Sequence, residues 1–329
     1  MADSTPALSR STKIIRTFVS DWGEELEEVA CPVCEATDAK FVLKSRDALY
    51  GKPGSYPLVR CASCSLVYVQ TRPTPRALGP HYPDDYFCYK APEDEHPWLR
   101  RAAESSARDC AKGRVLRLEH AMGQHVQPDT RLIDIGCGLN DFLQMVREQR
   151  GAVGTGIDMN ERMVRRIRER LEMPAIQGTL LDAGLPDGEL DVVSMHEYLE
   201  HEPDPLRVLA ESRRVLKTGG HVAIEIPHYG GLPSRLFKSR WSNLDLPRHL
   251  VFFEPDTLRK TLASQGFEMI SYQTFTLPFH FGISLVFVLG GLGLGRNPIA
   301  PWLAVALGWP FLPFQRWLPE FGLAVARAV

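Results

Sequence analysis

The stretch that decides the fold is RLIDIGCGLND, residues 131–141. Its apolar run over 132–135 ends at two glycines, Gly136 and Gly138, and the residues that follow favour a helix. Glycine adopts backbone conformations closed to other residues and lets the backbone come close to a ligand. The stretch therefore predicts a strand, a ligand-binding turn and a helix.

Beyond this turn, short apolar runs alternate with helical patterns. The alternation continues through GTGID, ERMVRRIRERLEM, LDVVSMHE, PLRVLAESRRVLKTGG and HVAIEI. Such alternation is typical of right-handed crossovers between parallel strands. The runs at 268–277 and 322–329 look like two closing strands. We therefore expect an α/β fold with a doubly wound, mostly parallel sheet, built from residues 131–278 and completed by residues 320–329.

Four further segments flank or interrupt this sheet. Residues 1–30 are polar and helix-prone, so we expect a loosely held N-terminal arm. Residues 31–90 are rich in Cys, Pro, Gly and Tyr. This composition suits a small, loop-rich module that needs cross-links such as disulfides or a metal ion for stability. Residues 91–130 indicate a helical linker, and residues 279–319 indicate an apolar helical hairpin inserted between the closing strands.

The composition argues against several classes of protein. Hydrophobic residues make up 44% and charged residues 24% of the 329 residues, which is ordinary for a folded soluble protein. The formal net charge of −2 argues against a general nucleic-acid partner. Because no apolar run precedes a small-residue cleavage site near residue 1, we do not expect export, and we expect a cytoplasmic protein.

The turn at Gly136 and Gly138 predicts a nucleoside ligand. Asp158 ends the second strand 20 residues after Gly138, where a carboxylate can accept both ribose hydroxyls. A dinucleotide fingerprint would need a third glycine where Asp141 stands, and a carboxylate there would oppose a pyrophosphate. No G-x-x-x-x-G-K-[ST] motif for ATP is present. The residues favour a nucleoside that carries an amino acid with an ammonium and a sulfonium group.

Four motifs in this order resemble those of the class I S-adenosylmethionine-dependent methyltransferases. They are LIDIGCG, GTGIDMN, GTLLDAGLPDGELDVVSMHEYLEH and VLKTGGHVAIEIP. The resemblance implies the seven-stranded, Rossmann-like methyltransferase fold and the cofactor S-adenosyl-L-methionine. It also implies that Asp134, Gly136 and Gly138 contact the methionyl part of the cofactor and that Asp158 binds its ribose. Met159 would cover one face of the adenine, and Thr179 and Leu180 would meet the adenine edge. Two positions depart from the family pattern: Asn140 replaces a third glycine, and Thr179 stands where an acid is frequent.

Two C-x-x-C pairs predict a metal site in the module at 31–90. Their thiols belong to Cys31, Cys34, Cys61 and Cys64. Two such pairs complete a tetrahedral shell without an open position, so we expect a structural Zn²⁺ ion. Iron fits the same ligands, and unrelated thiols or a redox pair are the open alternatives.

The cysteine pairs and the methyltransferase core together resemble bacterial small-molecule methyltransferases with an N-terminal zinc-binding module. Some of those enzymes act on nucleotide-linked deoxysugars, and others belong to surface-polysaccharide pathways. The resemblance implies that Tyr82 and Tyr86 lie close to the acceptor pocket. The alternative is that both tyrosines pack under a loop.

Candidate catalytic residues follow the fourth strand. Glu197, Glu200 and His201 have i, i+3, i+4 spacing, which would place them on one helical face. This E-x-x-E-H pattern is similar to the magnesium-associated triad of ubiquinone-pathway O-methyltransferases. The sequence Leu-Glu-His is also a packing element at a helix start in this superfamily, and this interpretation stays open.

A second group of candidates follows the fifth strand. His249 lies in PRHL, on a loop above the carboxyl edge of the sheet, and a histidine of ordinary pKa can take a hydroxyl proton at neutral pH. Arg248 could bind a phosphate or carboxylate of the acceptor, or it could pin the loop to the domain. His228 is a further candidate contact for the acceptor.

The apolar insertion has two interpretations. Its segments 281–295 and 297–315 carry no charged residue, yet a bilayer span takes about 20 apolar residues per helix. The first segment is short and prolines break the second, so we expect a shallow hairpin with peripheral contact at the inner face of the membrane. Trp302, Trp309 and Trp317 would suit the headgroup level. The alternative is a buried helical pair or a homodimer interface.

These patterns predict an S-adenosylmethionine-dependent methyltransferase that acts on a small-molecule acceptor. A sugar or a lipid-linked intermediate is the class of acceptor that the resemblance suggests. The alternative is a non-catalytic scaffold or binding module that keeps the fold. Asp134, Gly136, Gly138 and Asp158 favour the enzyme, because a scaffold has no need of this set.

Overall fold

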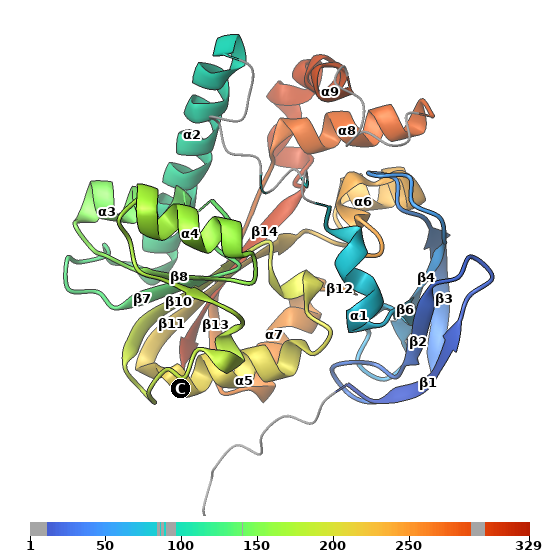
Figure 1. The fold of residues 1–329 in the computed structure, drawn as a ribbon, viewed down its shortest axis with the longest axis horizontal. Coiled ribbons are helices and arrows are strands. Elements are labelled where there is room, and N and C mark those ends of the chain that lie inside the picture. The colour runs from blue at the N-terminus through green and yellow to red at the C-terminus, as the bar shows by residue number, and fades with distance from the viewer. Residues whose placement is uncertain (1–11, 84–85, 87–88, 90–96, 140, 291–299) are drawn as a thin grey trace, which may run out of the picture.

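The computed structural model describes residues 12–83, 86, 89, 97–139, 141–290 and 300–329 (Figure 1). Its centre is a seven-stranded sheet with the order β13-β14-β11-β10-β7-β8-β9. Neighbours among β7 to β11 pair in parallel, whereas β14 runs antiparallel between β11 and β13. The strands are β7 (Leu132–Ile135), β8 (Thr155–Asp158), β9 (Ala175–Gln177), β10 (Leu190–His196), β11 (Leu216–Pro227), β13 (Phe267–Phe275) and β14 (Phe321–Ala328). The expected α/β fold is confirmed, including its mostly parallel sheet and a last strand taken from 320–329.

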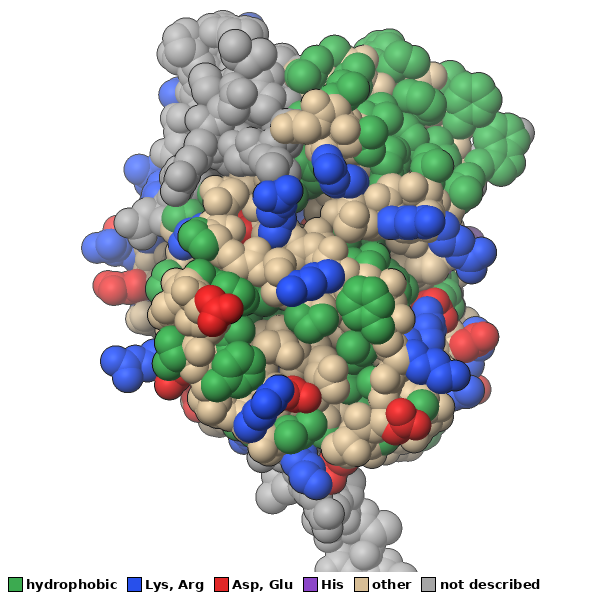
Figure 2. All heavy atoms as spheres, turned by 90° about the vertical axis from the view of Figure 1, so that its right-hand side faces the viewer, with side chains coloured by type: hydrophobic (Ala, Val, Ile, Leu, Met, Phe, Trp, Pro, Cys, Tyr) green, Lys and Arg blue, Asp and Glu red, His purple; other side chains and the backbone are tan. Residues whose placement is uncertain are grey.

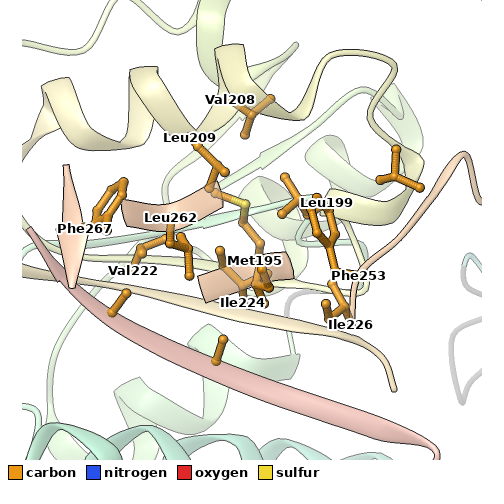
Figure 3. Packing of buried hydrophobic residues seen from close by; sticks show 14 of the residues in the cluster. Met195, Leu199, Val208, Leu209, Val222, Ile224, Ile226, Phe253, Leu262 and Phe267 are labelled. Atoms are coloured by element: carbon orange, nitrogen blue, oxygen red, sulfur yellow. The ribbon is translucent and has the colours of Figure 1, made fainter. Parts of the chain in front are cut away.

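Helices cover both faces of this sheet (Figure 1). On one face lie α2 (Pro97–Met122), α3 (Asp141–Arg150) and α4 (Glu161–Arg170); on the other lie α5 (Pro205–Val215) and α7 (Pro255–Ser264). Figure 3 shows the second layer, where Leu209 of α5 and Leu262 of α7 meet Met195 and Ile224 of the sheet. Burying such side chains stabilises the fold by about 25 cal/mol for each Å² of apolar surface removed from water.

Two small sheets form the N-terminal module. One has the order β1-β2-β6 and the other has the order β12-β5-β4-β3. The strands are β1 (Ile14–Val19), β2 (Glu25–Val29), β3 (Ala39–Ser45), β4 (Tyr56–Cys61), β5 (Val67–Val69), β6 (Thr71–Pro73) and β12 (Val251–Phe252), and α1 (Pro75–Leu78) and η1 (Gly79–His81) follow β6. Val251 of β12 pairs with Tyr68 of β5, so the methyltransferase-type core contributes one strand to the sheet of the module. This pairing holds the loop that carries Arg248 and His249 against the module.

The expectation of a helix-prone arm over 1–30 is wrong for its described part. Residues 14–19 and 25–29 form an antiparallel pair of strands, and β2 also pairs with β6. Leu26 and Val29 are buried, and the buried Glu27 accepts a hydrogen bond of 2.8 Å from Arg72. The polar character of residues 1–30 suggested a helix, but the β-branched and aromatic residues of β1 favour strands once a partner strand is available. Residues 1–11 lie outside the described part.

The described parts of the apolar insertion are helical, and residues 291–299 lie outside the described part. The insertion contains α8 (Pro278–Val288), α9 (Ala300–Gly308) and η9 (Trp309–Trp317), and it lies beside α6 (Leu232–Phe237) and η6 (Lys238–Arg240). A Cβ on Gly282 would lie 1.8 Å from the carbonyl oxygen of Ala304, so glycine lets α8 and α9 pack closely. None of the helices in the described ranges has the length and apolar character needed to cross a membrane.

Candidate functional site

The first strand-to-helix turn of the sheet has a backbone that only glycine adopts without strain. Gly136 and Gly138 have φ angles of 68° and 51°. A Cβ on Gly136 would lie 2.4 Å from Cδ2 of Tyr198, so a side chain there would collide with the ring. The amides of Gly136 and Cys137 both donate to the carbonyl of Ile157 at the end of β8. The turn is therefore folded back against the second strand.

Asp158 ends β8 beside this turn. Its two carboxylate oxygens accept hydrogen bonds of 2.8 Å from the amides of Gly138 and Asn160. Burial raises the pKa of Asp158, and the two amide bonds counter this effect. A carboxylate has about four acceptor positions, so each oxygen keeps a lone pair for a ribose hydroxyl. The arrangement fits the expected nucleoside ligand.

Three side chains expected around an adenine lie in different surroundings. Met159 is 67% exposed, which leaves its thioether available to cover one face of a ring. Thr179 donates from its hydroxyl to Asp182 at 2.7 Å. The side chain of Leu180, in η4 (Leu180–Asp182), is fully buried in the core, so only its backbone can meet a ligand.

A buried cluster of charged and polar groups lies across three neighbouring strand ends. His196 of β10 is in register with Glu225 of β11, and Ser194 is in register with Asp134 of β7. Arg114 of α2 donates to Glu225 at 2.6 Å. Burial raises the pKa of Glu225, but Arg114 and His196 outweigh it and hold that pKa below its usual value.

This cluster has unused hydrogen-bonding capacity. Both ring nitrogens of His196 are buried without a hydrogen-bond partner among the described residues, at 3.9 Å from Asp134 and 3.6 Å from Glu225. The sequence analysis missed Arg114 and Glu225. An acid inside the apolar run HVAIEI was the available signal for Glu225, whereas nothing in α2 distinguished Arg114 from other surface-type arginines.

Glu197 does not share a helical face with Glu200 and His201, so this expectation is wrong. Glu197 has φ 55°, and only the short η5 (Leu199–His201) follows it. Its carboxylate turns to Arg114, 3.2 Å away, at the cluster described above. Burial raises the pKa of Glu197 to about 7, with Arg114 opposing and Glu225 adding to the rise.

Instead, the structure brings Glu200 and His201 together with His249. Their potential ligand atoms all lie within 4.8 Å of one another. The carbonyl of Glu200 accepts a 2.7 Å bond from the amide of Leu250, which ties η5 to the loop after η7 (Ser242–Leu244). Burial and the neighbouring His249 lower the pKa of His201 to about 3, and burial lowers the pKa of His249.

Arg248 pins this loop to the N-terminal module, which was the second of its two expected roles. Its side chain is fully buried and binds both Asp47 and Asp245 as well as the carbonyl of His81. Burial raises the pKa of Asp245 and the charge of Arg248 lowers it, and the net effect is a pKa of about 2. All of the guanidinium is engaged inside the chain, so Arg248 is not available to an acceptor.

The remaining expected acceptor contacts lie around the same edge. The hydroxyl of Tyr82 lies 3.0 Å from Nδ1 of His201, and the rings of Tyr82 and Tyr86 are 5.4 Å apart in a T-shaped arrangement. Tyr86 is buried and donates to Asp245 at 3.3 Å. His228 follows β11 and pairs through Nδ1 with the hydroxyl of Tyr272 at 2.9 Å.

The two cysteine pairs form two turns of the same design. Glu35 and Ser65, each directly after a second cysteine, have positive φ angles of 60° and 67°. In each turn the amide of that residue donates to the carbonyl of the first cysteine, Cys31 or Cys61.

The sulfur atoms of these turns converge. Cys31 and Cys64 are 3.4 Å apart, as are Cys34 and Cys61, and all four lie within 4.8 Å of one another. Sulfurs in a tetrahedral zinc site are separated by about 3.8 Å, as follows from zinc–sulfur bonds of about 2.3 Å. The residues fit such a metal ion, and the closed shell leaves no position for a substrate.

The sheet order, the glycine turn and the carboxylate after the second strand define a class I S-adenosylmethionine-dependent methyltransferase. Residues 100–272 match the family described as "Methyltransferase domain", and the chain belongs to this family.

Two relatives carry names of methyltransferases. The chain is 26% identical over 200 residues to a sarcosine/dimethylglycine N-methyltransferase of Halorhodospira halochloris, which covers 58% of this chain and 70% of that protein. It is 35% identical over 106 residues to a demethylmenaquinone methyltransferase of Listeria welshimeri, which covers 30% of this chain. The second match spans only 45% of that relative's length.

A similar solved structure is the geranyl diphosphate C-methyltransferase from Streptomyces coelicolor A3(2), in complex with Mg²⁺, geranyl-S-thiolodiphosphate and S-adenosyl-L-homocysteine. Its TM-score is 0.47 at 16% identity, over 70% of this chain and 78% of that chain.

Proposed function

We propose that this protein transfers the methyl group of S-adenosyl-L-methionine to a small-molecule acceptor. The observation that carries the proposal is the first turn, where Gly136 and Gly138 adopt positive φ and Asp158 is held by two amides. The cofactor supplies an electrophilic methyl group on its sulfonium. The protein then has to bind it, align the acceptor with it and accept a proton.

Each cofactor group has a candidate partner. Asp158 receives the ribose hydroxyls, and Met159 covers one face of the adenine. Asp134 and the two glycines face the methionyl part, beside His196, whose ring nitrogens have no hydrogen-bond partner among the described residues. Thr179 and the backbone of Leu180 meet the adenine edge.

Among the three expected catalytic side chains, Glu197 is best suited to accept the proton. A general base works best when its pKa lies near the operating pH, and burial raises the pKa of Glu197 to about 7. The low pKa of His201, about 3, makes this imidazole a weak base, and the pKa of His249 is lowered too. We assign these two histidines a different role below.

The acceptor binds where the N-terminal module meets the carboxyl edge of the sheet. Tyr82 offers a hydroxyl and an aromatic face there, and His228 borders the same edge. Neutral hydroxyl and imidazole groups suit an acceptor rich in hydroxyls, which is why we propose a sugar or a lipid-linked intermediate. The four cysteines hold a structural Zn²⁺ ion that keeps the module folded against this pocket.

The test is the binding of S-adenosyl-L-homocysteine, measured by calorimetry and by the rise in melting temperature that a native-state ligand causes. Asp158→Ala removes two charge-assisted hydrogen bonds of about 1.5–3 kcal/mol each, so we expect affinity to fall by roughly 10²- to 10⁴-fold. Asp187→Ala is the matched control, because Asp187 is an exposed acid paired with Arg214 far from the turn. Stabilisation by NADH and none by S-adenosyl-L-homocysteine would overturn the proposal.

The apolar hairpin favours contact with a lipid surface. Figure 2 shows apolar side chains gathered over α8 and α9, with Lys and Arg side chains below them. Leu289 and Trp309 are 71% and 68% exposed, and the sequence contains no acid between 226 and 244 or between 269 and 319. Exposed cations come from Arg235, Lys238 and Arg240 of α6 and η6. An apolar centre with a basic rim suits shallow docking on an anionic bilayer.

Vesicle co-sedimentation tests this docking. Wild type should bind vesicles that contain anionic phosphatidylglycerol more strongly than vesicles of phosphatidylcholine alone, and Trp309→Ala should weaken binding. Phe41→Ala is the matched control, since Phe41 on β3 is also 68% exposed. Equal binding by wild type and Trp309→Ala, or a homodimer that Trp309→Ala dissociates, would contradict the membrane assignment.

A further inference from the structure

Three side chains from two segments form a compact cluster of potential metal ligands. Glu200, His201 and His249 offer one carboxylate and two imidazoles whose ligand atoms lie within 4.8 Å of one another. They come from two segments that are tied by the 2.7 Å bond between Leu250 and the carbonyl of Glu200. A further bond of 3.1 Å joins Nδ1 of His201 to the carbonyl of Arg248.

Backbone carbonyls orient both imidazoles in the same way. Nδ1 of His249 lies 2.8 Å from the carbonyl of Asn243, and Nδ1 of His201 lies 3.1 Å from the carbonyl of Arg248. A carbonyl only accepts, so Nδ1 of His249 carries the proton and its Nε2 keeps a lone pair. Nδ1 of His201 also lies 3.0 Å from the hydroxyl of Tyr82, which can donate or accept. Neither Nε2 has a hydrogen-bond partner within the described ranges. Metal-binding histidines are oriented by this kind of bond on the other nitrogen.

The carboxyl group of Glu200 is buried, and no cation pairs with it among the described residues. The residue is 1% exposed, and neither carboxylate oxygen has a hydrogen-bond partner among the residues that the structure describes. An unpaired buried carboxylate is costly, so such a group is normally paired or bound to a metal. The nearby arginines are engaged elsewhere: Arg248 binds Asp47 and Asp245, and Arg114 binds Glu225.

We propose that Glu200, His201 and His249 bind one divalent transition-metal ion, such as Zn²⁺, Fe²⁺, Mn²⁺ or Co²⁺. Two imidazole nitrogens and one carboxylate oxygen suit these ions, whereas Mg²⁺ and Ca²⁺ prefer oxygen ligands throughout. Glu197 is not a ligand in this site, because its carboxylate pairs with Arg114. The site is separate from the four cysteines, which offer only thiolates.

Three protein ligands leave coordination positions open, in contrast to the closed four-thiolate shell. This consequence rests on the proposed function: an acceptor hydroxyl bound at an open position becomes more acidic, and Glu197 can then take its proton more readily. His201 is only partly buried, and its Nδ1 lies 3.0 Å from the hydroxyl of Tyr82, a residue that the proposed function assigns to the acceptor. The chemical class of acceptor is then one with an oxygen donor.

Cobalt titration tests the site directly. Purified protein with its thiolate-bound ion in place is titrated with Co²⁺ and followed by calorimetry and visible absorption. Wild type should take up one further equivalent with weak d–d bands and without the intense sulfur-to-metal charge transfer of a thiolate site. Glu200→Gln and His249→Gln should lose this equivalent.

Two variants serve as matched controls. Glu320→Gln changes another fully buried glutamate with an unpaired oxygen, and His228→Gln changes another histidine at the same edge. Both should keep the equivalent.

Wild type without this further equivalent, or Glu200→Gln that binds Co²⁺ as wild type does, would overturn the proposal. Binding of S-adenosyl-L-homocysteine is measured on the same samples. If wild type takes up Co²⁺ but does not bind S-adenosyl-L-homocysteine, only the proposed function is refuted. If it binds S-adenosyl-L-homocysteine but takes up no further Co²⁺, only the metal site is refuted.

Discussion

Replacing Arg248 by methionine separates its structural role from a role in acceptor binding. The guanidinium donates to Asp245 at 2.9 Å and to Asp47 at 3.0 and 3.2 Å, and it also reaches the carbonyl of His81 at 3.1 Å. Arg248→Met keeps most of the apolar volume but leaves two carboxylates buried without a cation. Breaking a buried ion pair in this way costs about 3–5 kcal/mol.

That cost predicts a large loss of stability. The equilibrium constant for unfolding should rise by roughly 10²- to 10⁴-fold, and the melting temperature should fall by on the order of 10 °C. Urea denaturation followed by tryptophan fluorescence measures the change. Arg259→Met is the control, because Arg259 is more than half exposed in its pair with Asp256 and such a pair is worth under about 1 kcal/mol.

A double variant checks the origin of the loss. Adding Asp47→Asn to Arg248→Met removes one of the stranded charges, so the combined loss should be smaller than the sum of the two single losses. The reasoning is refuted if Arg248→Met unfolds within about 1 kcal/mol of wild type while KM for the acceptor rises. In that case Arg248 contacts the acceptor.

Three other perturbations have defined outcomes. Cys61→Ser should lose one zinc per chain and the protease resistance of residues 31–83, while Cys110→Ser keeps both; zinc-free wild type that resists protease would disprove this. Glu197→Gln should lower kcat by roughly 10²-fold or more without changing affinity for S-adenosyl-L-homocysteine, and it should remove the rise of rate with pH near 7. Burial lowers the pKa of His280 to about 4, so below about 6.5 the unfolded chain binds a proton that the native chain does not. Unfolding free energy should therefore fall between pH 6.5 and 4, and His280→Asn should reduce that slope; an unchanged slope would show that other groups cause it.

Much of the core was predictable because its signals are local. The strand, glycine turn and helix at 132–150 occupy consecutive residues, and Asp158 ends the very next strand. The closing strand at 321–328 was also found from its apolar pattern. In contrast, β1 and β2 were missed, since β1 pairs with β2 and β2 pairs with β6, and this pairing outweighs the local preferences of a polar segment.

The catalytic edge was less predictable than the cofactor turn. The E-x-x-E-H spacing suggested a helix, but Glu197 adopts a positive φ and its carboxylate turns to Arg114. Arg114 itself could not be singled out, because α2 contains several arginines and only packing against β11 distinguishes this one.

The sequence by itself determined the α/β class, the glycine turn after the first strand and the two cysteine turns, because each depends on residues a few positions apart. Only the tertiary structure decided which residues surround Arg248 and His249. Arg248 meets Asp47 across 201 positions of the chain, and His249 lies near Glu200 where the amide of Leu250 bonds to the carbonyl of Glu200. Contacts of this kind depend on how separate segments pack, and no local pattern of residues determines which buried charged side chains pair with each other.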